Sequence, residues 1–309
     1  MPVGREQIEE AARRIAGHVR ATPVLEPGPG AFGVASPLVL KLECLQHSGS
    51  FKARGAFNRL ITVEHGAGVV AASGGNFALA VAHAAAELNV GATIFVPEST
   101  PAAKLARLRA HPCEVVVAGA YYGEALAASR EHAAESGAVE LHAFDDEVIV
   151  AGQGTCAREF DRQAAGLDTV LVAVGGAGLI GGVAAWFASG TRVVAVEPER
   201  CPALHEALAA GAPMDVEVGG VAADSLGAAR VGDIPFAIAT EHVQRSLLVA
   251  DEQIMEARRR LWDGARVVAE PGGAAALAAL TAGVYEPQPG ERVGVLVCGA
   301  NTDPATVTV

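Results

Sequence analysis

Short apolar runs alternate with segments of helical periodicity along most of this chain. The alternating run from Leu38 to Glu43 and the apolar runs Val69–Ala72 and Ala92–Val96 predict strands. The segments between such runs repeat their apolar residues every three or four positions, which predicts helices. Further strands are predicted at 115–117, 169–174, 193–196 and 293–297, and helices at 76–88, 102–110, 122–135, 154–165, 251–264 and 272–282. Strands and helices that alternate in this way predict βαβ units, mostly parallel sheets and an α/β fold.

The N-terminal segment predicts one amphipathic helix from Arg5 to Arg20. Ile8, Ala12, Ile15 and Val19 fall on one face of that helix. We expect it to end at Thr22-Pro23, because the residue before a proline is disfavoured in the helical conformation.

Composition excludes several classes of protein. With 309 residues, 51% of them hydrophobic, the chain is large enough for a sizeable core and two lobes. No uncharged apolar run reaches the roughly 18 residues that a membrane span needs. The net charge of −12 argues against nucleic acid as a partner. The five cysteines are scattered without framework spacing, so we expect reduced thiols and a cytoplasmic protein.

One lysine lies at an unusual corner between a predicted strand and a predicted helix. The stretch Ser48-Gly49-Ser50-Phe51-Lys52-Ala53-Arg54-Gly55 follows the strand at 38–43 and precedes helical spacing at 56–61. A cation is disfavoured at a helix N-terminus unless it is neutralised or used chemically. A desolvated lysine has a lowered pKa and can form a Schiff base. A solvated loop lysine is the simpler alternative.

A glycine-rich loop after the strand at 169–174 predicts an anion site. Backbone N–H groups of such a loop, at the start of a helix, can bind phosphate without a basic side chain. The run Gly176-Ala177-Gly178-Leu179-Ile180-Gly181 also fits the dinucleotide fingerprint, with Glu197 at the end of the next strand. The loop alone therefore leaves NAD open as a ligand.

Four segments are expected to meet in one crevice. In open α/β sheets, ligands bind beyond the carboxyl ends of the strands. Lys52, Ser73–Asn76, Gly175–Gly178 and Cys298 each follow a predicted strand. An NAD site has no use for the lysine corner, the asparagine loop or the cysteine.

The motif Ser-x-Ser-Phe-Lys-x-Arg-Gly resembles the cofactor-lysine motif of the serine/threonine dehydratases, which are pyridoxal-phosphate enzymes of fold type II. The resemblance extends from Thr22-Pro23-Val24 to Cys298-Gly299-Ala300-Asn301. It implies a tryptophan synthase β-like fold of two lobes, each a mostly parallel open twisted sheet flanked by helices. Residues 1–67 and 147–309 would form the large cofactor-binding domain, and residues 68–146 the small one. It also implies a homodimer.

The resemblance assigns a role to each of these segments. Lys52 would hold pyridoxal phosphate through a Schiff base, and the Asn76 amide would donate to the ring oxygen of the cofactor. The loop Ser73-Gly74-Gly75-Asn76 would hold the substrate carboxylate, and Cys298 would meet the pyridine nitrogen. The remaining implied cofactor contacts are Phe51, Gly175, Gly176, Ala177, Gly178, Leu179 and, beneath the ring, Gly220. The segment Glu270-Pro271-Gly272-Gly273 resembles a late Glu-Pro segment of the family.

The chain departs from the family pattern at three positions. Phe77 stands where histidine is frequent. Gly74 stands where the related serine racemases have a serine that serves the second face of the substrate, so we expect little racemisation. Ala203 stands where a companion carboxylate to Glu197 would complete a divalent-cation site, so we expect no metal.

The predicted function is β-elimination from a small hydroxy-amino acid. L-Threonine or L-serine would lose water and ammonia to give a 2-oxo acid, with Lys52 as the catalytic residue. An NAD-binding oxidoreductase that uses the Gly176–Gly181 loop is one alternative. A related lyase that acts on another hydroxy-amino acid, such as 3-hydroxyaspartate, is a second. A cofactor-binding or sensor protein that kept the fold and lost turnover is a third.

Overall fold

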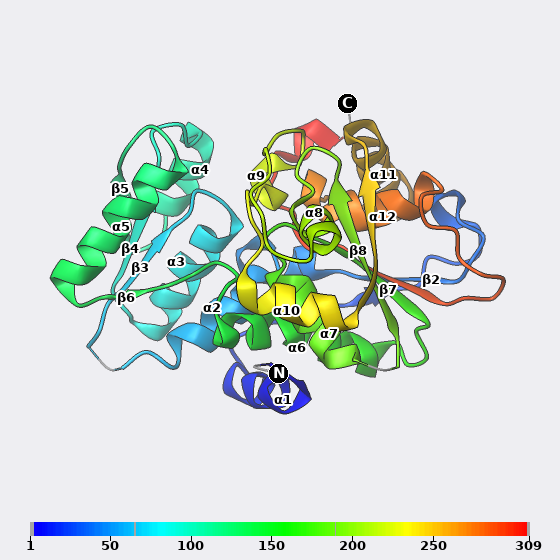
Figure 1. The fold of residues 1–309 in the computed structure, drawn as a ribbon, viewed down its shortest axis with the longest axis horizontal. Helices are drawn as coiled ribbons and strands as arrows, with labels where there is room; N and C mark the ends of the chain where they lie inside the picture. Colours follow the sequence, from blue (N-terminus) through cyan, green and yellow to red (C-terminus); the bar gives the residue numbers. More distant parts are fainter. Residues whose placement is uncertain (1–2, 65, 189, 308–309) are drawn as a thin grey trace.

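The computed structural model describes residues 3–64, 66–188 and 190–307. It contains two sheets flanked by helices, so the α/β prediction is confirmed (Figure 1). The larger sheet has the order β1 (Val24–Leu25), β2 (Leu38–Lys41), β10 (Val293–Leu296), β7 (Thr169–Ala173), β8 (Arg192–Pro198) and β9 (Val243–Val249). The smaller sheet has the order β5 (Glu114–Val117), β4 (Ala92–Val96), β3 (Val69–Ala72) and β6 (Val139–Glu140). All neighbouring strands are parallel except the pair β1 and β2.

Most helices follow the strands that the hydrophobic pattern predicts. Those of the smaller lobe are α3 (Asn76–Leu88), α4 (Ala102–Arg109) and α5 (Tyr122–Ser136). The rest are α1 (Arg5–Arg14), α2 (Lys52–Leu60), α6 (Glu147–Gln163), α7 (Gly178–Phe187), α8 (Ala203–Ala210), α9 (Ala223–Leu226), α10 (Asp233–His242), α11 (Asp251–Ala265) and α12 (Pro271–Thr281). Short 3-10 turns lie at η1 (Ala31–Gly33), η2 (Glu43–Leu45), η3 (His47–Gly49) and η4 (Pro304–Val307).

Some predicted boundaries are wrong. Helix α1 ends at Arg14 instead of Arg20, and Gly17 just beyond it has the left-handed φ of 87° that interrupts a helix. Helix α6 begins at Glu147 instead of Gly154, because the Asp146 carboxylate accepts hydrogen bonds from Val148 N and Ile149 N. Strand β9 was not predicted, because its first half is largely polar and exposed at the edge of the sheet.

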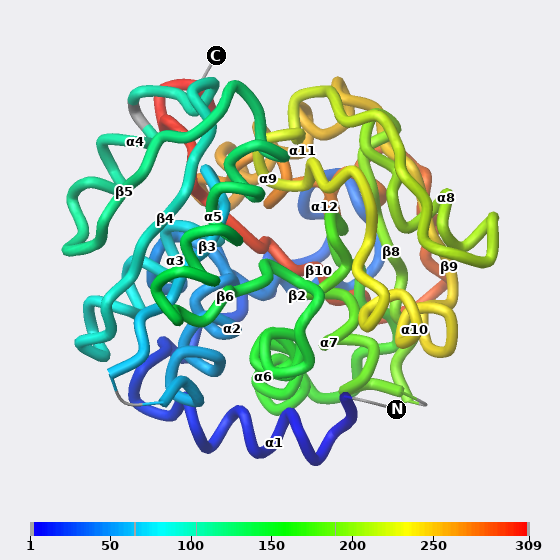
Figure 2. The backbone as a smooth tube through the Cα atoms, turned by 60° about the vertical axis from the view of Figure 1, so that its left-hand side comes forward, coloured from blue at the N-terminus to red at the C-terminus, as the bar shows by residue number. Residues whose placement is uncertain are grey.

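The core brings distant parts of the chain together. Strand β10, near the C-terminus, lies between β2 and β7, and every residue of β10 and β2 is buried (Figure 2). A separate hydrophobic cluster joins α2 and α3 to the smaller sheet. That sheet lies wholly within the small domain predicted at 68–146, whose exact boundaries stay a prediction.

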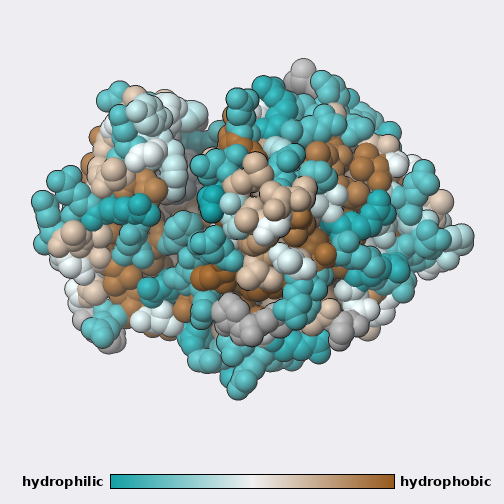
Figure 3. Space-filling model, in the orientation of Figure 1, coloured by the Kyte–Doolittle hydropathy of each residue, from teal (hydrophilic) through white to brown (hydrophobic). Residues whose placement is uncertain are grey.

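Polar residues cover most of the face drawn in Figure 3, with smaller hydrophobic patches between them. Among the described residues, no helix is both long and apolar enough to cross a membrane.

Candidate active site

Lys52 is the first residue of α2, and its side chain enters a cleft between the two lobes. The cleft is lined by Phe51, Lys52, Asn76, Ala173 to Ile180, Ser225, Leu226, Glu270 and Cys298. The Nζ atom donates a hydrogen bond to the carbonyl oxygen of Ala143 at 2.9 Å and lies 5.2 Å from the Phe51 ring centroid. Burial lowers the Lys52 pKa to about 8. A larger fraction of this amine is therefore neutral, and nucleophilic, than of an exposed lysine.

The other lysines of the chain are Lys41 and Lys104. Lys41 is fully buried and paired with Glu159, with 2.5 Å between Nζ and Oε1. Lys104 pairs with Asp224, with 3.0 Å between Nζ and Oδ1. Lys52 has no carboxylate partner among the described residues, so it is the lysine that is free to react.

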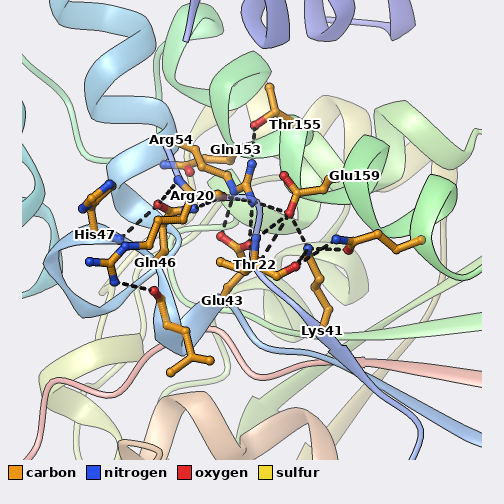
Figure 4. A network of polar contacts seen from close by, with 12 residues as sticks. Arg20, Thr22, Lys41, Glu43, Gln46, His47, Arg54, Gln153, Thr155 and Glu159 are labelled. Atoms are coloured by element: carbon orange, nitrogen blue, oxygen red, sulfur yellow. Dashed lines mark hydrogen bonds and ion pairs between the residues drawn. The ribbon is translucent and has the colours of Figure 1, made fainter. Parts of the chain in front are cut away.

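A buried ionic network fixes the start of α2 (Figure 4). Arg54 Nε and Nη2 donate to the two carboxylate oxygens of Glu43 at 2.8 and 2.7 Å. Both side chains are buried, at 1% and 0% relative exposure. Burial alone would raise the pKa of Glu43, but Arg54, Lys41 and Thr22 together lower it. Glu43 lies two residues beyond the end of β2, so this pair anchors the helix that carries Lys52 to the larger sheet.

The glycine loop has the geometry of an anion site. No N–H group from Gly175 to Leu179 donates a hydrogen bond within the described chain. These groups lie at the N-terminus of α7, where the helix dipole favours negative charge. A Cβ atom at Gly176 would overlap the Phe144 ring, and one at Gly178 would lie 2.8 Å from Phe144 Cβ. Glycine is therefore required at both positions for Phe144 to pack over the loop.

Of the asparagine loop, only Asn76 lines the cleft. The Ser73 hydroxyl accepts a hydrogen bond from Gly75 N at 3.3 Å. Gly74 packs under Thr100, whose Oγ1 would lie 3.1 Å from a Cβ at position 74. A Cβ at Gly75 would lie 3.3 Å from the Asp224 carbonyl oxygen of the larger lobe. The substrate contacts predicted for Ser73, Gly74 and Gly75 remain predictions.

Cys298 follows β10 and lies in the same cleft as Lys52. Two backbone hydrogen bonds place it there, from Cys44 N to Val297 O at 2.8 Å and from Phe51 N to Cys298 O at 3.1 Å. Burial and the neighbouring Glu270 carboxyl hold the thiol pKa far above its usual range. The thiol is therefore uncharged, and its weak S–H donor points to the Gly272 carbonyl oxygen at 3.6 Å.

Gly220 does not line the cleft. It has a φ of 81°, and a Cβ there would lie 2.6 Å from Asp251 Oδ1. Of the segment that follows Gly220, Ser225 and Leu226 line the cleft. The predicted passage of Gly220 beneath the cofactor ring is therefore left as a prediction.

Sequence reasoning gave no role to two polar residues near Lys52. Glu270 lies in the cleft, where burial raises its pKa to about 7. Asn301 contacts Asn76 from the segment after β10, with 2.6 Å between Asn301 Nδ2 and Asn76 Oδ1. Asn301 follows a strand, as the other site segments do, and Glu270 immediately precedes the Pro271 that starts α12. These two positions, one after a strand and one before a helix, were the sequence features that could have pointed to Asn301 and Glu270.

Glu197 is fully engaged away from the cleft. Its carboxylate accepts hydrogen bonds from Leu204 N and His205 N, each at 2.7 Å, and from Ser246 Oγ at 3.2 Å. Burial raises its pKa to about 7. Glu197 thus satisfies the N-terminal amides of α8, and this carboxylate is not free to bind the ribose of a dinucleotide.

A histidine cluster (His47, His83 and His111) lies outside the cleft, between η3, α3 and the turn after α4. The His47 and His83 rings stack with 4.9 Å between their centroids, and His111 lies edge-on to His83 at 6.2 Å. Burial lowers the pKa of all three imidazoles, and the neighbouring Arg20 and Arg107 lower them further.

The cleft residues fit pyridoxal phosphate. Lys52 offers an amine of lowered pKa, and the loop from Gly175 to Leu179 offers unpaired amide donors for a phosphate. Asn76 and Cys298 offer a side-chain amide and a neutral thiol to the polar atoms of a pyridine ring.

Comparison with known proteins agrees with this chemistry. Residues 15–299 match the family described as pyridoxal-phosphate dependent enzyme. The chain is 37% identical to phenylserine dehydratase of Ralstonia pickettii, over 95% of this chain and 91% of that protein. It is 35% identical to L-threonine ammonia-lyase of Geobacter sulfurreducens, over 98% of this chain and 76% of the relative. Its fold matches maize serine racemase with a TM-score of 0.94 and 31% identity, over 99% and 96% of the two chains. The chain therefore belongs to the pyridoxal-phosphate-dependent enzymes, in the fold type II family of serine and threonine dehydratases.

Proposed function

We propose that this protein is a lyase that removes water and ammonia from a β-hydroxy-amino acid. L-Threonine would give 2-oxobutanoate and L-serine would give pyruvate. The observation that carries the proposal is the Lys52 amine, which lies partly buried in a cleft, has no carboxylate partner among the described residues and has a pKa of about 8. It shares that cleft with a glycine loop whose amide groups are free to bind phosphate.

In this proposal, some residues of the cleft bind the cofactor, and Lys52 also transfers a proton. Pyridoxal phosphate, when bound, supplies an electron sink for the α-carbon of an amino acid. Lys52 attaches the cofactor, and its released amine is the base held nearest to take the α-proton. The uncharged Cys298 thiol would meet the ring nitrogen without supplying an acid, which favours departure of the β-hydroxyl over a long-lived carbanion.

Glu197 argues against the dinucleotide alternative. A dinucleotide site needs an acidic side chain free at the end of the second strand to bind the ribose. Here that carboxylate is buried and accepts two backbone N–H groups of α8 and one hydroxyl. The run Gly176–Gly181 thus matches only the phosphate-binding part of the dinucleotide fingerprint, because the acidic residue is not free to bind a ribose.

Charge in the cleft favours a substrate with a single carboxylate. Among the described residues that line it, Lys52 is the only cation, and the cofactor occupies that amine. A second carboxylate, as in 3-hydroxyaspartate, would lie there without a positive partner. The rings of Phe51 and Phe77 lie 5.2 and 5.7 Å from Lys52 Nζ, and the phenylserine dehydratase relationship makes phenylserine a second candidate substrate.

The test is turnover on a substrate panel, with identification of the lysine that holds the cofactor. We expect the protein with pyridoxal phosphate to release 2-oxo acid and ammonia from L-threonine or L-serine. Borohydride reduction and peptide mapping should place the label on Lys52 and not on Lys41 or Lys104. Lys52→Ala should abolish label and turnover but keep the fold, while Lys104→Ala should retain both. Normal turnover by Lys52→Ala would refute the mechanism.

A further inference from the structure

We propose that Asn301 and Glu270 are positioning residues that hold the Asn76 carboxamide in one orientation. In that orientation the Asn76 N–H group faces Glu270 and the cleft, and the Asn76 oxygen faces Asn301. The inference rests on the proposed function, because it gives the Asn76 amide the task of donating to the cofactor.

Two groups with unambiguous roles fix the orientation of Asn301. Asn301 Nδ2 lies 2.8 Å from the Ser48 carbonyl oxygen, which can only accept a hydrogen bond. Asn301 Oδ1 lies 2.5 Å from Arg107 Nη2, which can only donate. The nitrogen and oxygen of this amide therefore cannot be exchanged without losing both contacts.

Asn301 in turn determines the orientation of Asn76. Asn301 Nδ2 also donates to Asn76 Oδ1 at 2.6 Å, so the oxygen of Asn76 must face Asn301. The Asn76 nitrogen then donates to Glu270 Oε1 at 2.6 Å. An amide nitrogen carries two hydrogens, so the second N–H of Asn76 remains for a ligand in the cleft. A reversed amide would present an oxygen where the cofactor's ring oxygen needs a donor.

Close packing leaves Glu270 and Asn301 little freedom to move. Glu270 is only 4% exposed, and a Cβ at Gly299 would overlap its Oε1 atom. A Cβ at Gly49 would lie 2.5 Å from Asn301 Oδ1, and Gly49 has a φ of 78°. Because Gly299 and Gly49 have no side chains, there is room for the side chains of Glu270 and Asn301 at these positions.

The same contacts join the two lobes across the cleft. Asn76 belongs to α3 and Arg107 to α4, both in the smaller lobe. In the larger lobe, Glu270 directly precedes α12, and Asn301 lies in the segment after β10. Helix α4 makes a second contact across the lobes, the pair Lys104 and Asp224 at 3.0 Å, which does not touch Asn301. Both cations lower the pKa of Glu270, but only Arg107 contacts Asn301, so Lys104→Ala is a matched control for the Arg107–Asn301 hydrogen bond.

The decisive experiment reverses the Asn76 amide while it keeps the hydrogen bonds between the side chains. In Asn301→Asp the carboxylate can only accept, so Asn76 must turn its nitrogen toward it and its oxygen toward Glu270. Above the Glu270 pKa of about 7, two acceptors then face each other in a buried place, which destabilises the fold, so the comparison is made at pH 9. Adding Glu270→Gln supplies an N–H that donates to the reversed oxygen. The Ser48 carbonyl loses its donor in both variants, so that loss cancels when they are compared.

The variants are compared by the urea midpoint of the apoprotein and by the Kd for pyridoxal phosphate from an absorbance titration. We expect Asn301→Asp to lower the midpoint, and the double variant to recover most of it. We expect the double variant to bind the cofactor about tenfold more weakly than the wild type, because a donor to a charged ligand is lost. Glu270→Gln alone measures what the change at Glu270 itself costs, and we expect the double variant to bind more weakly than it does, because only the double variant reverses the Asn76 amide.

Arg107→Ala gives a further test in a variant whose substitution is at the surface. We expect it to weaken cofactor binding severalfold, and Lys104→Ala to have a clearly smaller effect, because Lys104 acts on Glu270 only through its charge. Wild-type affinity in the double variant, or equal effects of Arg107→Ala and Lys104→Ala, would overturn the inference. A wild-type protein that does not bind pyridoxal phosphate would refute the proposed function instead, so the two failures are distinguishable.

Discussion

Removal of the Arg54 guanidinium should be among the most destabilising single changes in this protein. The Arg54→Met side chain fills similar space but leaves the Glu43 carboxylate buried at 0% exposure without its two guanidinium hydrogen bonds. Loss of one partner from a buried ion pair typically costs about 3–5 kcal/mol. Whole domains are stable by only about 5–15 kcal/mol, so the loss takes a large share of the total.

The magnitude can be tested with a control on the same helix and a compensating second change. Arg59 pairs with Asp146 at 3.0 Å, but both side chains are about one-fifth exposed. We expect Arg59→Met to cost about 0–1 kcal/mol, as partly solvated pairs do. Adding Glu43→Leu to Arg54→Met should recover much of the loss, because the unpaired charge is then gone. Lys41 and Glu159 still pair with each other in all of these variants.

The assay is urea unfolding of the apoprotein, followed by circular dichroism and analysed by linear extrapolation. If Arg54→Met loses no more than Arg59→Met, the buried pair does not anchor α2. If Glu43→Leu fails to restore stability, the cost arises from lost packing around Arg54 and not from an unpaired carboxylate.

Four further predictions concern the cleft and the histidine cluster outside it. Attachment of pyridoxal phosphate to the apoprotein should speed up as pH rises and level off above about pH 8, the Lys52 pKa, because only the neutral amine attacks; a rise that continues to pH 10 would contradict the burial argument. Cys298→Asp should favour a protonated ring nitrogen, slow elimination and increase α-proton exchange, whereas Cys298→Ser should not; proton exchange in deuterated water measures this. Racemisation of L-serine should be about 10²–10⁴-fold slower than elimination, as chiral chromatography of the products can measure. Gly74→Ser should raise the racemisation rate, and more so together with Thr100→Ala, which removes the contact at 3.1 Å; abundant D-serine from the wild type would mean that the loop is misassigned. The histidine cluster has lowered pKa values, so below about pH 6.5 these imidazoles bind more protons in the unfolded chain and lower the stability as pH falls, whereas Glu197 and Glu270, whose pKa values are raised, act in the opposite direction; urea midpoints at pH 8 and 5.5 should therefore show that His83→Phe loses less stability on acidification, or gains more, than the wild type.

The sequence by itself determined the fold class and the position of the lysine that lines the cleft. Hydrophobic periodicity is a local property, so α3 and β4 begin and end where the pattern predicts. The strand-end rule then placed Lys52, Asn76, the glycine loop and Cys298 in one cleft, because parallel strands share one carboxyl edge. Both arguments need only short stretches of chain.

Tertiary structure alone decided which polar groups pair. The sequence contains nothing local that joins Asn301 to Asn76, because these residues come from different lobes. Glu43 and Arg54 meet only because the turns η2 and η3 place the start of α2 beside the segment that follows β2. Tertiary structure also determined that Glu197 satisfies the start of α8 and does not remain free for a ligand. Strand β9 escaped prediction for the same reason: its polar half is tolerated only because it lies at the edge of the sheet. Hydrogen bonds between distant segments depend on three-dimensional placement, and periodicity along the chain does not encode it.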